Sequence, residues 1–251
     1  MRSNFMRVLA VAALALVAAS SAACSSSTPS ASPFAGKTPA QVLAMATAAA
    51  LAKGSVHVVG DDNIGGFGTA HWVTDAGATQ GKQIVTGSAG NCTTLILSAQ
   101  VAYFRGDATC LENYLQFPGH EATKYAGQWI AVPSSSSDYE GLVAAQTDSS
   151  MINVGLTPSE PLRFTKPTTI DGKSVIGISG GLGSYSAPSA GTQVLYISTA
   201  APYLPVAYVL SGTQSNGKPL TSSGHMSNYG ESVVVTEPAH SILISSIPGT
   251  S

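Results

Sequence analysis

Residues 92–105 read CTTLILSAQVAYFR, a stretch rich in the β-branched and aromatic residues that favour strands. It predicts two strands, Thr93–Ser98 and Val101–Arg105, joined by a two-residue turn at Ala99 and Gln100. Clusters of Gly, Asp and Asn separate further strand-like runs on its N-terminal side, as expected for antiparallel hairpins. These runs are Ser55–Val59, Thr69–Thr74 and Gln83–Thr86.

Two cysteines flank this hairpin. With a two-residue turn, position 92 would lie opposite about position 107, so Cys110 would lie within one helical turn of Cys92. The pair therefore predicts a disulfide in an oxidising compartment. We expect it to be structural, because the sequence has no C-x-x-C spacing of the redox-active kind. Two buried thiols are the alternative.

A helix is predicted to precede the strands. Thr38-Pro39-Ala40-Gln41 has an N-cap Thr, Pro at the first helical position and Gln at the third, which is a capping-box pattern. Val42, Met45, Ala46 and Ala49 then recur on one helical face, and Gly54 ends the helix. The apolar face is expected to pack on a sheet.

The rest of the chain predicts a helical middle followed by a second run of strands. Helical segments are expected over 107–114, 121–126 and 138–146, with an extended stretch at Gln128–Val132. Asp171-Gly172 and Asn216-Gly217 are hairpin signals. The expected strands are Leu162–Lys166, Ser174–Ser179, Thr192–Ser198, Val206–Ser211, His225–Tyr229 and Val233–Thr236, and Ser241–Ile247 is either a last strand or a segment tucked under the sheet.

This order of elements predicts one α+β domain with a large curved antiparallel sheet and helices gathered on one face. Residues 1–23 precede it and have the pattern of an export signal, with a basic start, an apolar run too short to span a bilayer, and small residues. A cysteine follows directly, so we expect cleavage before Cys24 and lipidation on it. Plain signal cleavage after Ala23 is the alternative. Residues 24–37 are rich in Ser, Thr and Pro and predict a flexible tether.

Three passages resemble a known family. Thr38–Val59 is similar to the family's first helix and the strand after it, which opens Ser-Val-His. Residues 125–132 are similar to a segment of the family that contains a Trp, and residues 228–235 are similar to a late strand that is followed by Pro. Together they resemble the actinobacterial envelope lipoproteins related to the mycobacterial LppX/LprG group, which share a fold with the LolA lipoprotein carriers. The resemblance implies a half-barrel over residues 38–251, with helices covering its concave face and an apolar cavity for lipid acyl chains.

The residues expected to line this cavity come from the first helix and the 92–105 hairpin; a closed core is the alternative for the same residues. The expected function is a lipid-anchored, exported lipoprotein on the outer face of the cell membrane, which binds and carries a lipid or glycolipid. The alternative is a scaffold lipoprotein that docks an envelope transporter or a cell-wall component. The predicted lining residues are Val42, Met45, Leu95, Leu97, Ala102 and Phe104.

Composition and motifs argue against other classes of function. The net charge is −2 and only 10% of residues are charged, with no basic cluster, so a nucleic-acid partner is not expected. Gly177-Ile178-Ser179-Gly180-Gly181 matches G-x-S-x-G, but the loop-like residues after it lack the helix of a nucleophile elbow. The five histidines are dispersed, and Asp61-Asp62 is expected in a solvated turn. We therefore expect no enzyme activity, metal or cofactor.

Overall fold

This computed structural model describes residues 33–65, 68–98, 100–143, 146–155, 157–182, 188–214 and 216–249. Residues 32–251 form one compact unit, to which all the described helices and strands belong. The expected signal sequence, Cys24 and most of the expected tether lie outside the described residues. Within the described ranges, no helix is long and apolar enough to cross a membrane.

Helices and strands follow the order expected from the sequence. The helices are α1 (Pro39–Leu51), α2 (Ala108–Tyr114), α3 (Gly119–Tyr125), α4 (Tyr139–Val143) and α5 (Asp148–Ser150), with the π-helical turn η1 (Met151–Gly155) and the 3₁₀ turn η2 (Ile244–Ser246). The strands are β1 (Ser55–Ile64), β2 (Gly68–Gly77), β3 (Gly81–Gly87), β4 (Cys92–Ser98), β5 (Val101–Gly106), β6 (Ile130–Pro133), β7 (Ser159–Phe164), β8 (Thr168–Ile170), β9 (Lys173–Gly181), β10 (Pro188–Ser198), β11 (Pro205–Gln214), β12 (Pro219–Ser227) and β13 (Ile242–Leu243).

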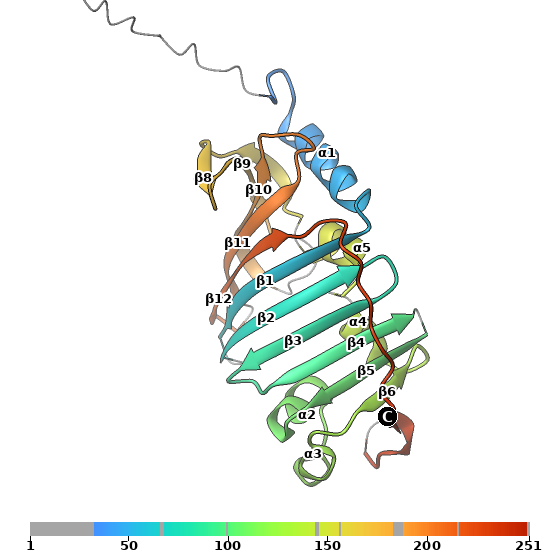
Figure 1. The fold of residues 1–251 in the computed structure, drawn as a ribbon. Helices are drawn as coiled ribbons and strands as arrows, with labels where there is room; N and C mark the ends of the chain where they lie inside the picture. The colour runs from blue at the N-terminus through green and yellow to red at the C-terminus, as the bar shows by residue number, and fades with distance from the viewer. Residues whose placement is uncertain are drawn as a thin grey trace, which may run out of the picture. The chain divides into compact units, whose positions relative to one another are not determined.

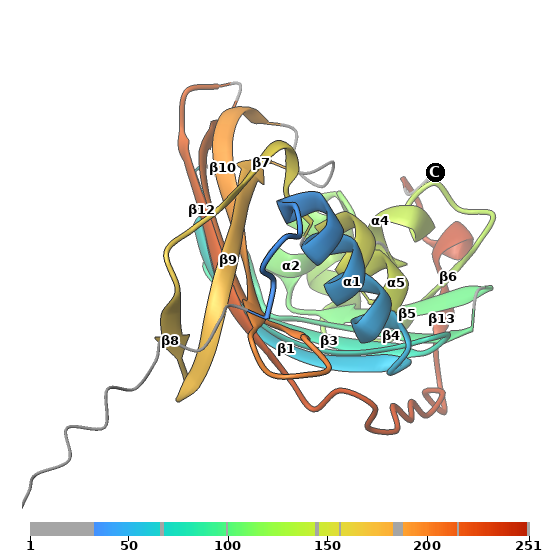
Figure 2. The same ribbon diagram turned by 90° about the horizontal axis from the view of Figure 1, so that it is seen from above.

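The thirteen strands of the described residues form one sheet, in the order β13-β6-β5-β4-β3-β2-β1-β12-β11-β10-β9-β7, with β8 paired to β9 (Figure 1). All pairs are antiparallel except β13 with β6. The sheet does not close into a barrel, since β13 and β7 remain its two ends. Figure 2 shows it curving around the helices, which lie on its concave face. The predicted α+β class with a large curved antiparallel sheet is confirmed.

Alternation along the strands determines which side chains face the helices. Because successive side chains of a strand point to opposite faces, Val56 and Val58 of β1 share the concave face with Trp72 and Ala76 of β2. These residues belong to one buried cluster that also contains Val42 of α1. The helices thus fill the hollow of the sheet with apolar side chains, and burial of that surface stabilises the fold at roughly 25 cal/mol per Å².

The N-terminus of α1 has the predicted capping box. Thr38 Oγ1 accepts a hydrogen bond from the Gln41 backbone N–H at 3.2 Å, and Gln41 Oε1 accepts from the Thr38 N–H at 2.9 Å. Two N–H groups that the helix cannot satisfy are thereby paired. This cap defines where the chain enters the hollow of the sheet.

The predicted strand Val233–Thr236 is wrong. Residues 228–241, here called the C-terminal strap, have no regular secondary structure and cross the convex face of the sheet from β1 toward β6 (Figure 1). The strap follows β12, whose neighbours on both sides are the strands β1 and β11, so no free strand edge is available beside it. Its Val234 side chain is 80% exposed. After the strap come the short strand β13 and the turn η2, so the predicted segment 241–247 is part strand and part 3₁₀ turn.

Polar contacts hold the C-terminal strap on the sheet. The Ser55 hydroxyl donates to the Glu231 carbonyl at 2.6 Å, and the Val235 N–H donates to Gln80 Oε1 at 3.3 Å. The Tyr103 hydroxyl of β5 donates to the Glu237 carboxylate. The strap therefore covers the convex side of strands that would otherwise expose apolar side chains such as Leu95, which is 8% exposed.

The Tyr103–Glu237 contact predicts a pH dependence at alkaline pH. The Glu237 carboxylate, together with burial, raises the pKa of Tyr103 to about 12 from the ordinary value of 10.0. The unfolded chain loses this proton near pH 10, whereas the folded protein keeps it. Stability from the contact is therefore present below pH 10 and is lost as the pH rises toward about 12. In urea unfolding at pH 8 and pH 11, Tyr103→Phe should lose less stability than wild type between the two conditions; an equal loss in both proteins would contradict the assignment.

Candidate functional site

The structure divides the predicted cavity residues between two faces of the sheet. Val42, Ala102 and Phe104 are 0, 0 and 1% exposed and belong to the buried cluster on the concave face. Met45 of α1 is half-buried. Leu95 is paired with Tyr103 and lies on the convex face, opposite to Phe104. The side chain of Leu97 lies outside the described part of the structure.

The shared face expected for Leu95 and Phe104 is therefore wrong, and a β-bulge is the cause. Ser98 pairs with Val101, but the next pair is Ile96 with Ala102, so β4 has one extra residue beside the turn. One extra residue moves every following side chain of the strand to the other face. Thr94 and Ile96, rather than Leu95, accompany Ala102 and Phe104 on the concave face.

Cys92 and Cys110 are joined by a disulfide, with their Cα atoms 5.9 Å apart. It ties the start of β4 to α2. Asp107 caps this helix as predicted: Oδ1 accepts from the Cys110 N–H at 2.8 Å, and Oδ2 accepts from the Asn91 backbone and side-chain N–H groups at 3.0 and 2.8 Å. Burial acts to raise the pKa of Asp107, but these hydrogen bonds outweigh it and lower the pKa.

Helices close the hollow of the sheet. α1 packs against β1, β7, β11 and η1, and Figure 2 shows α1, α2, α4 and α5 all on the inner side of the curve. In this arrangement the concave residues form a packed apolar interior. Because Val42, Ala102 and Phe104 are almost fully buried, an apolar ligand could contact these three side chains only if helices moved away from the sheet.

Four neighbouring strands bring polar side chains together on the concave face. Asp62 of β1 pairs in register with Ser222 of β12, and the hydroxyls of Ser222 and Tyr208 (β11) are 2.9 Å apart. The rings of Trp72 (β2) and Tyr208 are nearly parallel, with centroids 6.5 Å apart and planes at 26°. We call these four residues the inner polar cluster. The cluster faces Tyr114 of α2, whose pKa is raised by burial and by the charge of Asp62.

Two glycines allow the rings to lie flat on the sheet. A Cβ atom at Gly60 would lie 2.5 Å from the Trp72 ring, and one at Gly224 would lie 2.7 Å from the Tyr208 ring. Gly60 and Gly224 are themselves partners in the β1–β12 register. Any larger residue at either position would push its ring away from the backbone, so the glycine pair orients the aromatic part of the cluster.

The solvated turn expected at Asp61-Asp62 is wrong, because β1 continues through both residues to Ile64. Alternation from Val56 and Val58 assigns Asp62 to the concave face, which is the signal that could have identified it. Its partners could not be found in this way, because they belong to strands more than 100 residues further along the chain or to the next hairpin.

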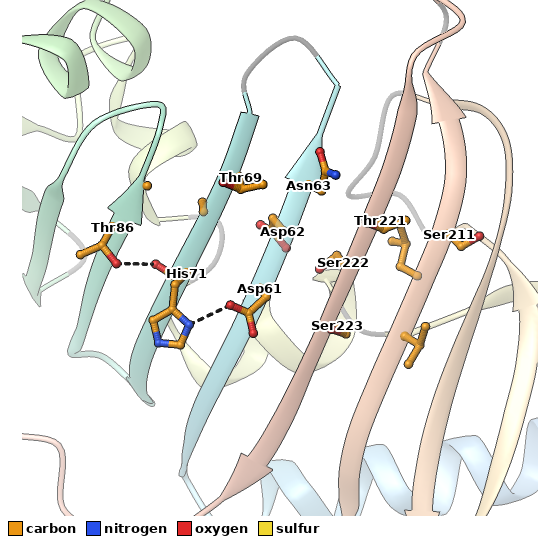
Figure 3. A pocket seen from close by; sticks show the side chains of 14 residues that line it. Asp61, Asp62, Asn63, Thr69, His71, Thr86, Ser211, Thr221, Ser222 and Ser223 are labelled. Carbon is orange, nitrogen blue, oxygen red and sulfur yellow. Dashed lines mark hydrogen bonds and ion pairs between the residues drawn. The ribbon is translucent and has the colours of Figure 1, made fainter.

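A groove of about 530 Å³ lies over β3, β2, β1, β12 and β11, with most of its lining side chains on the convex face (Figure 3). Asp62 and Ser222, whose side chains belong to the inner polar cluster, are also among its lining residues. His71 Nδ1 and Asp61 Oδ1 are 2.9 Å apart in this groove, and both side chains are exposed. A second cross-strand pair, His57 and Asp75, lies on the same face with a separation of 2.6 Å. The groove is lined by Asp61, Asp62, Asn63, Thr69, Ala70, His71, Thr86, Gly87, Val209, Leu210, Ser211, Thr221, Ser222 and Ser223.

The G-x-S-x-G serine lies within a strand. β9 continues to Gly181, and the Ser179 hydroxyl donates to the Arg163 carbonyl at 3.3 Å. A nucleophile elbow needs a sharp turn from a strand into a helix at the serine. Ser179 thus has no such setting. Among the described residues, no group of three or more His, Cys, Asp or Glu side chains is arranged to hold a metal ion.

Comparisons with known proteins give only distant structural matches. No family model and no curated protein matches the chain. Among solved structures, LprF from Mycobacterium bovis aligns with a TM-score of 0.48 and 14% identity, over 80% of this chain and 97% of LprF. MucB in complex with MucA aligns with a TM-score of 0.32 and 9% identity, over 76% of this chain and 56% of MucB. A DUF1329 family protein from Desulfovibrio piger aligns with a TM-score of 0.27 and 8% identity, over 74% of this chain and 91% of that protein.

The fold defines a class of protein, an open curved sheet wrapped around helices. At these identities the similarity is one of fold.

Proposed function

We propose that the chain is an exported lipoprotein that holds the acyl chains of a lipid or glycolipid between its helices and the concave face of its sheet. In this proposal residues 1–23 are the signal, Cys24 is the acylated N-terminus, residues 24–37 are the tether and residues 38–251 are the binding domain. The observation that supports it is the unclosed sheet, whose concave face is apolar and is covered by short helices instead of a second sheet. Helices can move off such a face without breaking strand pairs.

Binding would shield the acyl chains from water, at roughly 25 cal/mol for each Å² removed. Val42, Ala102 and Phe104 are almost fully buried, so binding against these side chains requires the interior to open. α1 is the element best suited to move, since Ala46 and Ala50 give it small side chains at the interface with the sheet. Release to a membrane or to an envelope transporter would reverse the motion.

The closed interior also favours the second candidate, a scaffold lipoprotein whose half-barrel is a filled core. In that case the convex face, which has the groove, would be the surface that docks a partner. The two candidates differ in whether lipid enters the interior, which can be measured.

Native mass spectrometry tests the proposed function. The full chain with Cys24→Ser, which has no acylation site, should be purified without detergent after export. We expect co-purified lipid and, in a vesicle assay, transfer of a fluorescent lipid from donor to acceptor vesicles. A protein that has no bound lipid and transfers none would contradict the carrier proposal and favour the scaffold.

Wild-type protein serves as the matched comparison for the anchor. We expect it to sediment with membranes and to have an N-terminal mass increase from acyl chains, because stable anchoring requires more than one chain. Cys24→Ser should be released in soluble form. Recovery of both proteins in the soluble fraction would contradict the anchor and leave the binding domain unaffected.

A further inference from the structure

The inner polar cluster leaves two buried polar atoms unsatisfied. Among the described residues, neither Asp62 Oδ1 nor Trp72 Nε1 makes a hydrogen bond of ordinary geometry, although both atoms are buried and the indole N–H lies near the carboxyl. The Trp72 side chain is only 9% exposed. Leaving a buried donor or acceptor unpaired is costly, so native proteins do so rarely, and a bound water, ion or ligand is one explanation for such a group.

The two atoms are chemically complementary to a single group. Trp72 Nε1–H can only donate a hydrogen bond, whereas a carboxylate oxygen of Asp62 accepts one. A hydroxyl does both: its oxygen accepts from the indole and its proton goes to the carboxylate. The neighbouring Tyr208 and Ser222 hydroxyls already hydrogen-bond each other, so they frame this position.

Charge and hydrogen-bonding chemistry favour an uncharged group, since an ammonium has no acceptor for the Trp72 N–H. The ion pairs of the described residues do not include Asp62, and a phosphate or carboxylate placed there would face a carboxylate of like charge. Burial raises the pKa of Asp62, while the Ser222 hydroxyl and the Trp72 indole N–H, which lie near enough to favour the charged carboxylate without ordinary hydrogen-bond geometry, oppose the rise. A neutral hydroxyl fits either protonation state of the carboxyl, because it can donate to the ionised form and accept from the protonated form.

The position adjoins the apolar interior. Trp72, Tyr208 and Phe104 belong to the same buried cluster, and the Phe104 ring lies 6.4 Å from that of Tyr114. Tyr114 is 44% exposed, so this end of the concave face reaches solvent. A ligand with acyl chains among the core side chains could therefore place its polar end beside Asp62.

We propose that Asp62 and Trp72 form a hydroxyl-binding site that selects uncharged, hydroxyl-bearing lipids. The site rests on the proposed function, since the acyl chain must occupy the adjoining interior. Asp62 accepts the hydroxyl proton, Trp72 donates to the hydroxyl oxygen, and the glycine pair under the rings orients the donor.

Two probes with the same acyl chain test the site: 1-monooleoylglycerol, which has free hydroxyls, and methyl oleate, which has none. Dissociation constants would be measured by displacement of a fluorescent acyl probe from the full chain with Cys24→Ser. Wild type should prefer monooleoylglycerol, and Asp62→Leu, which has a similar shape but no acceptor, should lower that preference about tenfold. Methyl oleate should bind Asp62→Leu as well as wild type or better.

Matched variants separate the site from a general change of the sheet. Asp62→Asn keeps an acceptor oxygen and should keep the preference, whereas Trp72→Phe keeps the ring without the donor and should lower it. Asp61→Leu changes the residue before Asp62 in β1, which lies on the convex face, and should leave the preference for monooleoylglycerol unchanged. Asp62→Leu should also unfold at an equal or higher temperature, since it removes an unsatisfied buried group.

Each outcome decides between the two proposals. Equal binding of both probes by wild type, or a preference that survives Asp62→Leu, would overturn the hydroxyl site and leave acyl binding standing; the two atoms would then be paired by water only. Failure of wild type to bind either probe would overturn both proposals. A preference lost in Asp62→Leu and Trp72→Phe but retained in Asp62→Asn and Asp61→Leu would support the site.

Discussion

Phe104→Ala is expected to lower the free energy of unfolding by about 3–5 kcal/mol, the range for removing a large buried aromatic side chain. Phe104 is 1% exposed and is among the largest fully buried side chains on the concave face. It lies on β5 in the centre of the β4–β5–β6 region, where Thr94 and Ile130 are its register partners. Backbone pairing restrains the strands on both sides, so they cannot collapse to fill the space.

Urea unfolding followed by circular dichroism would measure this loss. Phe164→Ala is a suitable control, because Phe164 lies on the edge strand β7 and is 36% exposed. We expect the control to lose a much smaller part of the stability. A loss of about 1 kcal/mol or less in Phe104→Ala would mean that the ring faces open space, and the ligand-free interior would then be a standing cavity instead of a closed core.

Local signals were enough to predict much of the fold. Thr38 and Gln41 predicted the start of α1, since a capping box depends on residues three apart. Asp171-Gly172 predicted the β8–β9 hairpin, whose residues Asp171 and Gly172 both have positive φ, at 49° and 74°. Asp107 predicted the cap of α2. In each case the decisive contact joins residues close together in the chain.

The candidate site depended on features that are not local. The β-bulge between Ile96 and Ser98 changed the face of Leu95, and a two-residue turn gave no indication of it. The inner polar cluster needs Asp62 beside Ser222, a pairing of strands about 160 residues apart that only the sheet order determines. Val233–Thr236 has the composition of a strand, but no strand edge was free to pair with it.

These misses have a common physical cause. Face assignment in a strand has a period of two, so a shift of one residue exchanges the interior and the exterior for the whole strand. Gly60 and Gly224 show the same dependence on register, because each makes room for a ring only while the two strands keep this pairing. A lipid-holding interior in this fold is thus specified by register as much as by apolar composition.

Removal of the Cys92–Cys110 disulfide is expected to lower the free energy of unfolding by about 3 kcal/mol. The two cysteines are 18 residues apart, and cross-linking a loop of about this length removes entropy from the unfolded chain by roughly that amount. The bond also holds α2 against the start of β4, next to the Asp107 cap. Cys92→Ala combined with Cys110→Ala is the variant of choice, since both side chains are buried and no unpaired thiol remains.

Reduction of the wild-type protein provides the matched measurement, because it opens the same loop without changing the sequence. The double variant should unfold at lower urea concentration than oxidised wild type, at nearly the same concentration as reduced wild type, and should be insensitive to reductant. The β4–β5 pairing does not depend on the bond, so the variant should keep the sheet signal in circular dichroism. Equal stability of oxidised and reduced wild type would show that the loop is already ordered in the unfolded chain, and the entropic account of this disulfide would then be wrong.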